Sequence, residues 1–186
     1  MQKLLLAAAL LAATATRAQA QNNVLKVNIL SPIVKTGSFF FEHKLNEHSS
    51  AQLGGLVTYW KIGDTKISGF ALTPEYRMYL SEKKGALRGF YVAPYLRYQN
   101  LTLTVEDVFD DGTNVTSKGK LNTYGGGVVA GYQLLLKDRF SLDFFLGPSY
   151  NGGDIEVESL GHSESFDAGP FTGFGLRSGL TFGVAF

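Results

Sequence analysis

GPFTGFGLRSGLTFGVAF, residues 169–186, is the stretch from which the fold can be read. Its even-numbered positions are mostly apolar from Phe174 to Phe186, whereas its odd-numbered positions are mostly glycine or small residues and include Arg177. Side chains of a β-strand point alternately to opposite faces, so this segment is a strand with one apolar face and one small, polar face. The small face suits the crowded interior of a narrow barrel, which leaves the apolar face for lipid.

The N-terminus has the features of a secretory signal peptide. Lys3 supplies a positive charge, residues 4–13 are an apolar run, and Ala18-Gln19-Ala20 is an A-x-A cleavage site. The apolar run is shorter than the roughly 20 residues that a membrane-spanning helix needs. We therefore expect residues 1–20 to be a cleaved signal peptide and residues 21–186 to form one domain.

Composition excludes several classes of protein. The formal net charge is +1, and removal of residues 1–20, which hold two basic residues and no acidic one, makes it −1. A chain so near neutrality offers no basic surface to nucleic acid, and we expect none to bind. The chain has no cysteine, which excludes disulfides and Cys-ligated metals. No segment after residue 20 is apolar enough for a transmembrane helix.

Period-two alternation continues along the chain and predicts eight strands. They cover residues 24–32, 38–45, 50–60, 68–80, 87–101, 120–136, 139–150 and 169–186. The predicted fold class is all-β, an eight-stranded antiparallel up-and-down transmembrane β-barrel. Every second connection is a short turn, and the longest of the others are predicted as loops at 104–118 and 151–168. Outer-membrane barrels sort their connections in this way, which predicts that both termini are periplasmic.

Two further expectations concern the sheet itself. If the turn after the fourth strand centres on Lys84, Phe70 pairs with Tyr98 and Met78 pairs with Phe90. Proline removes a donor from the ladder, so we expect bulges or rim positions at the prolines within predicted strands. These are Pro32, Pro74, Pro94, Pro148 and Pro170.

The inward positions of the predicted strands carry many polar residues. Charges inside a barrel are costly unless they pair, and an eight-stranded barrel is about wide enough for side chains alone. We therefore expect a polar network that fills the lumen, in preference to a gated pore or a proton relay. Removal of Arg97 or Glu75 should then lower stability and leave ion conductance unchanged. The predicted lumen network comprises Lys26, Asn28, Glu42, Lys44, Gln52, Glu75, Arg77, Arg97, Gln99, Gln133, Asp143 and Arg177.

Three stretches carry a resemblance to a known group of proteins. They are VNILSP at 27–32, TPEYRMY at 73–79 and YVAPY at 91–95. Together with the eight strands, they resemble the small OmpA- and OmpX-like outer-membrane barrels, in particular an uncharacterised subgroup described as a domain of unknown function. The resemblance implies a bacterial outer-membrane location and brings no catalytic residues. The last strand also resembles the C-terminal assembly signal of such barrels, which implies outer-membrane lipids and the barrel assembly machinery as partners. The signal would comprise Leu180, Phe182, Val184 and Phe186.

The sequence thus predicts a small outer-membrane barrel of a Gram-negative bacterium with a structural or surface-interaction role. We expect no open pore, no enzymatic activity and no catalytic, metal or cofactor site, and we leave an extracellular partner open. One alternative is a soluble lipocalin-like barrel, which would need an apolar ligand cavity. Another is a rim enzyme acting on lipid A through a histidine and a serine of the last loop, where His162, Ser163, Glu164 and Ser165 are adjacent. The acidic residues of that loop could hold cations or keep it solvated: Asp154, Glu156, Glu158, Glu164 and Asp167.

Overall fold

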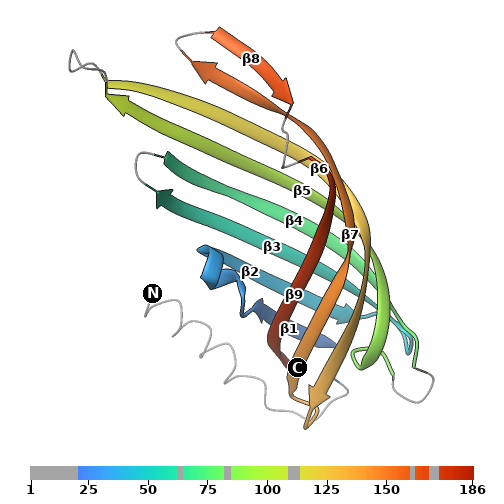
Figure 1. Cartoon of the computed structure of the whole chain (residues 1–186). Helices are drawn as coiled ribbons and strands as arrows, with labels where there is room; N and C mark the ends of the chain where they lie inside the picture. Colours follow the sequence, from blue (N-terminus) through green and yellow to red (C-terminus); the bar gives the residue numbers. More distant parts are fainter. Residues whose placement is uncertain (1–20, 63–64, 82–84, 109–113, 160–161, 168–171) are drawn as a thin grey trace.

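The computed structural model describes residues 21–62, 65–81, 85–108, 114–159, 162–167 and 172–186, and the predicted signal peptide lies outside them. The described chain is almost entirely strand (Figure 1). The strands are β1 (Asn23–Asn28), β2 (Thr36–Lys44), β3 (Ser49–Ile62), β4 (Thr65–Tyr79), β5 (Gly89–Val108), β6 (Asn114–Leu136), β7 (Phe140–Ser159), β8 (His162–Asp167) and β9 (Gly173–Ala185). Among the described residues, no helix is long and apolar enough to cross a membrane.

Eight of these strands form a closed antiparallel ring. Each strand from β1 to β7 pairs with the next, β7 pairs with β9, and β9 pairs with β1. The ring closes where Val27 faces Phe182, and the Asn23 N–H donates to the Phe186 carbonyl at 3.0 Å. The predicted eight-stranded up-and-down barrel is confirmed. The remaining strand, β8, is paired with the part of β7 that extends beyond the ring.

Alternation places apolar side chains outside and polar or small ones inside. In β4, Leu72 and Met78 are 46% and 41% exposed, while Arg77 is buried. Inward glycines make room for bulky neighbours, because a Cβ on Gly131 would collide with the ring of Tyr91. A Cβ on Gly179 of β9 would likewise collide with the ring of Phe145, so the glycines of this inner face follow from the size of the side chains that lie against them.

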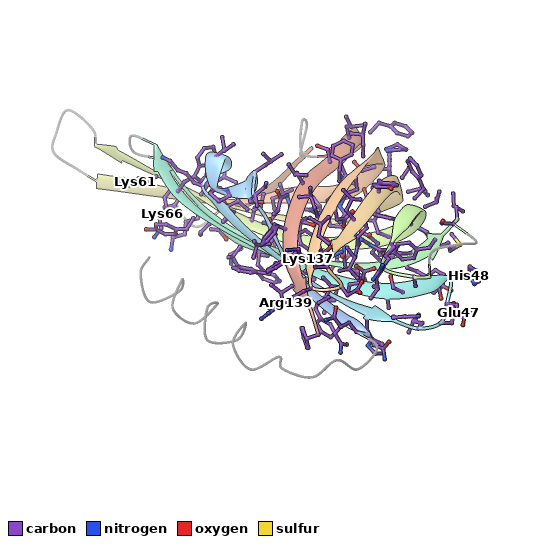
Figure 2. All side chains as sticks on the ribbon, turned by 90° about the horizontal axis from the view of Figure 1, so that it is seen from below. Glu47, His48, Lys61, Lys66, Lys137 and Arg139 are labelled. Atoms are coloured by element: carbon purple, nitrogen blue, oxygen red, sulfur yellow. The ribbon has the colours of Figure 1, made fainter. Side chains whose placement is uncertain are left out.

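The outside of the barrel is an apolar belt with charges at its ends. The outward positions of β4 from Phe70 to Met78, of β5 from Phe90 to Tyr98 and of β6 from Tyr124 to Leu136 hold no Asp, Glu, Lys or Arg. Lys118 and Lys120 lie outward in β6 beyond this range, toward the projecting hairpin. Outward rings pack edge to face across strands, with centroids 4.6 Å apart for Phe90 and Tyr132. Figure 2 shows the charged ends: Lys61 and Lys66 at the tip of the β3–β4 hairpin, and Glu47, His48, Lys137 and Arg139 at the turns away from it.

The predicted loops at 104–118 and 151–168 are wrong over most of their length. The residues on either side of 109–113 pair in a β5–β6 hairpin that continues both strands. The second predicted loop contains the end of β7 and all of β8, which pair with each other. Both hairpins project at the end of the barrel opposite the C-terminus (Figure 1). Their strands are polar, so the alternation of apolar residues could not reveal them.

The first strand ends earlier than the predicted range of 24–32. The Leu30 N–H donates to Asn28 Oδ1 at 3.0 Å, a local bond that turns the backbone out of the strand. A 3₁₀ helix, η1 (Ser31–Val34), follows and contains Pro32. Lys35 closes it in the left-handed conformation, with φ of 52°.

The pairing of β4 with β5 differs from the prediction by two residues. Phe70 faces Asn100 and Met78 faces Val92, so the faces are correct and the register is not. A slip of two residues leaves every side chain on its predicted face, and alternation alone cannot detect it. The observed register centres this turn one residue after Lys84.

The prolines of the strands do not produce the expected bulges at the positions that the structure describes. The register of β4 and β5 is the same on both sides of Pro74 and Pro94, where Leu72 pairs with Tyr98 and Met78 pairs with Val92. The pairs that would include the two prolines are missing from this ladder. The lost donors thus interrupt hydrogen bonds without adding a residue. Pro148 lies in a similar gap between β6 and β7, and Pro170 lies outside the described residues.

Candidate functional site

Six charged side chains meet inside the barrel, and we call them the six-charge network: Lys26, Glu42, Glu75, Arg77, Asp143 and Arg177. Lys26 Nζ lies 2.5 Å from Glu42 Oε2 and 3.2 Å from Asp143 Oδ2. Arg77 Nη1 lies 2.8 Å from Asp143 Oδ2, and Arg77 Nε lies 2.7 Å from Glu75 Oε1. Arg177 Nη1 lies 2.7 Å from Glu75 Oε2. Arg77 Nη1 also lies 3.5 Å from Glu42 Oε2, so each acid is held by two bases.

Strand register brings these residues together from distant parts of the sequence. Glu42 faces Gln52 across β2 and β3, and Gln52 faces Glu75 across β3 and β4, so the two carboxylates point inward from nearby strands. Asp143 faces Gln133 across β6 and β7. Because all of these positions lie on the inward face, a ring of only eight strands brings them within hydrogen-bonding distance.

Hydroxyl and amide groups complete the hydrogen bonding of the acids. The Tyr79 hydroxyl donates to Glu42 Oε1 at 2.6 Å, and the Ser50 hydroxyl donates to the same oxygen at 2.5 Å. The Tyr91 hydroxyl donates to Asp143 Oδ1 at 2.8 Å. Such bonds to an ionised carboxylate are about twice as strong as neutral ones and offset part of the cost of burying the charge.

Aromatic rings separate and hold the guanidinium groups. Arg77 lies over the Tyr91 ring at 4.3 Å, and Arg177 lies over the Tyr95 ring at 4.3 Å and the Phe145 ring at 4.8 Å. Both arginines therefore combine an ion pair with a cation–π contact. This combination fits the planar guanidinium better than the ammonium of lysine.

The network balances its own charge. Three bases face three acids, and all six side chains are at most 10% exposed. Removal of one member would leave a buried charge without a partner, which is far more costly than the loss of a surface ion pair. The arrangement can hold the strands of the ring in one register.

The structure does not bring all the predicted lumen residues into this network. Gln52 and Gln133 join the six charges, since Gln133 Oε1 accepts from Lys26 at 3.0 Å and from Arg77 at 2.9 Å. The other four lie elsewhere: Asn28 at the end of β1, Lys44 beside Gly85, and Arg97 and Gln99 next to each other on β5. The predicted assembly signal, Leu180 to Phe186 at even positions, lies on the outward face of β9 and just after it.

The sequence prediction missed the network's hydroxyl donors. Tyr79, Tyr91 and Ser50 are buried and donate to its carboxylates. The signal for the two tyrosines was their inward position, on the same face as Glu75 and Arg97. Tyrosine also suits an interface girdle or an apolar core, so residue type alone did not distinguish these roles.

The candidate groups of the last loop lie outside the described side chains. This applies to His162 and Ser163, proposed for a rim enzyme, and to the acidic residues from Asp154 to Asp167.

A closed eight-stranded barrel with an apolar exterior and charged, hydrogen-bonded residues inside has the architecture of a small transmembrane barrel of the OmpA-like class. The chain belongs to the family described as "Protein of unknown function (DUF3575)", whose model matches residues 5–157. A search of curated proteins finds no match.

Two solved structures are similar to the chain. Acinetobacter baumannii CarO matches with a TM-score of 0.49 at 12% identity, over 90% of this chain and 97% of that one. The N-terminal β-barrel domain of Pseudomonas aeruginosa OprF matches with a TM-score of 0.37 at 12% identity, over 90% of this chain and 100% of that domain.

Proposed function

We propose that this protein is a structural or surface-interaction barrel of the outer membrane of a Gram-negative bacterium, with its lumen closed to ions by the six-charge network. Both termini would lie in the periplasm, and the β5–β6 and β7–β8 hairpins would face the environment. We propose no catalytic activity. The observation that carries the proposal is the combination of an apolar exterior with buried, mutually paired charges inside.

The exterior supports a membrane location. Phe90 and Leu96 are 65% and 68% exposed, and large apolar side chains surround them on neighbouring strands. In water such a continuous apolar surface would lead to aggregation, whereas acyl chains would cover it. The charged tips of Figure 2 would then lie at the two lipid–water interfaces.

The interior supports a closed lumen. The ion pairs of Lys26, Arg77 and Asp143 cross it from β1, β4 and β7, and their side chains are fully buried. An ion would have to break these contacts to pass. A soluble lipocalin-like barrel fits less well, because its ligand cavity would be apolar where this chain has charges.

Two measurements test location and closure. In fractionated cells the protein should be in the outer membrane and should migrate differently in gels before and after boiling. In planar bilayers the purified protein should show no steady conductance. A monodisperse protein in plain buffer would contradict the membrane location. A conductance that Glu75→Gln or Arg77→Met alters would contradict the closed lumen.

The proposed assembly signal has its own test. Phe186→Ala should reduce the fraction of protein that reaches the folded, heat-modifiable form in cells, because the assembly machinery would read the terminal aromatic residue. Phe174→Ala is a matched control, since Phe174 is an outward residue of the same strand at its other end and is 90% exposed. Equal yields from the two variants would contradict the role of Phe186.

The absence of catalysis is tested on lipid A, the substrate that the rim-enzyme alternative would use. Mass spectra of lipid A from cells with and without the protein should be identical. A change in acylation that His162→Ala abolishes would replace our proposal with an enzymatic function.

A further inference from the structure

Arg97 differs from the other inward arginines in its partners. Its Nη2 and Nε atoms donate to Gln99 Oε1 at 2.9 and 3.3 Å, and among the described residues it forms no ion pair. Arg77 and Arg177, by contrast, each bind at least one carboxylate. The three acids of the described lumen are already held within the six-charge network, so none remains to neutralise Arg97.

A second cation lies close to Arg97. The guanidinium of Arg177 sits over the Tyr95 ring at 4.3 Å, and Tyr95 is two residues before Arg97 on the same inward face of β5. Tyr95 is thus a common neighbour of both arginines, of Arg177 through its ring and of Arg97 along the strand. Two like charges in a partly desolvated space repel each other. An anion bound between them would make the electrostatic energy of the group favourable.

A third donor lies beside the two arginines. The hydroxyl of Tyr95 is buried and has no hydrogen-bond partner among the residues that the structure describes. It extends toward β6 at Gly127, and the next inward position of that strand is Gly125, which faces Arg97. A buried hydroxyl without a partner is costly, and an acceptor placed here would satisfy it.

The inward positions around these donors are small. Tyr95 faces Gly127, Gly127 faces Ser149, and Ser149 faces Gly175. Arg177 faces Gly147. The wall between the two arginines, on β6 and β7, therefore contributes little side-chain volume at this level. Arg97 is itself partly exposed, so solvent reaches it.

From these contacts we infer an oxyanion-binding site in the lumen, on the hairpin side of the six-charge network, formed by Arg97, Arg177 and the Tyr95 hydroxyl. Its ligand is a small anion whose oxygens accept several hydrogen bonds, such as a carboxylate, sulfate or phosphate group. Guanidinium groups bind such anions through paired N–H donors, which a halide cannot use as well. The site would be entered from the side of the projecting hairpins and would be closed beneath by the network.

Titration calorimetry of the refolded full-length barrel tests the site, with sodium sulfate, sodium phosphate and sodium acetate as separate probes and sodium chloride as the control salt. We expect saturable binding of at least one oxyanion with one site per barrel, and no comparable heat from chloride. Arg97→Gln should weaken that binding by about tenfold, as expected for loss of a charge-assisted contact. Tyr95→Phe, which removes only an unpartnered hydroxyl, should weaken it by a smaller factor.

Lys44→Gln is the matched charge control, because Lys44 is an inward base of β2 at the opposite end of the lumen. It should bind oxyanions as the wild type does, and the gel mobility of unboiled samples should show that each variant is folded. The inference is overturned by wild-type protein that binds none of the probes, by equal affinities for chloride and the oxyanions, or by Arg97→Gln and Lys44→Gln having the same effect.

Discussion

Two neighbouring layers of the lumen use the same residue types in opposite ways. In the six-charge network, Arg77 is buried between Asp143 and Glu75, and every charge has a partner of opposite sign. One layer toward the hairpins, the one hydrogen-bond partner of the Arg97 side chain within the described part of the chain is the neutral Gln99. The first layer is complete without a ligand, whereas the second has donors in excess. The difference shows that an inward arginine in a narrow barrel is not a structural residue by position alone.

The sharpest test of this contrast is the removal of each arginine in turn. Arg77→Met should lower the free energy of unfolding by about 3–5 kcal/mol, because Asp143 and Glu75 lose a buried partner. Arg97→Met should lower it by less than about 1 kcal/mol, since no buried charge is left behind. Urea unfolding of the two variants in the same lipid vesicles measures both. Similar losses would mean that the two layers do not differ.

The tyrosines of the two layers give a second, smaller contrast. Tyr91→Phe should cost about 1.5–3 kcal/mol, because the bond to the Asp143 carboxylate is lost. Tyr95→Phe should leave stability nearly unchanged in buffers without oxyanions, since its hydroxyl has no partner. Urea unfolding of the two variants in lipid vesicles measures both changes in the free energy of unfolding. A large loss in Tyr95→Phe would show that this hydroxyl is bonded in the folded barrel.

Glycine positions test how tightly the network layer is packed. Gly131→Ala should destabilise the barrel by about 1–3 kcal/mol, because the new methyl group meets the Tyr91 ring and displaces its hydroxyl from Asp143. Gly55→Ala is the control in a strand of the same ring, where a Cβ meets nothing within 4 Å. Its stability should change by less than about 0.5 kcal/mol. Equal tolerance at both positions would indicate a loosely packed lumen.

Alternation does not distinguish Arg97 from Glu75, and from sequence the same loss of stability is expected for removal of either residue. Each is an inward residue flanked by polar neighbours, and alternation reports only the face on which a residue lies. Glu75 turns out to hold two arginines of the network, at 2.7 Å each. Arg97 has no such contact, so its loss should not destabilise the barrel as the loss of Glu75 should. Which inward side chains meet across the lumen depends on the register of the strands and the stagger of the barrel. Neither can be read from the amino-acid sequence.

The number of ring strands, their antiparallel order and the face of each side chain can be predicted from the amino-acid sequence. Those features follow from the period of two in a strand, which is local and survives any shift of pairing by two residues. The tertiary structure alone decided the β4–β5 register, the extension of the hairpins, and the grouping of Lys26, Glu42 and Asp143 from strands far apart in the chain. Closure of the ring fixes the register and the grouping of the charges, because only a closed barrel with a definite stagger sets which inward side chains meet across its axis.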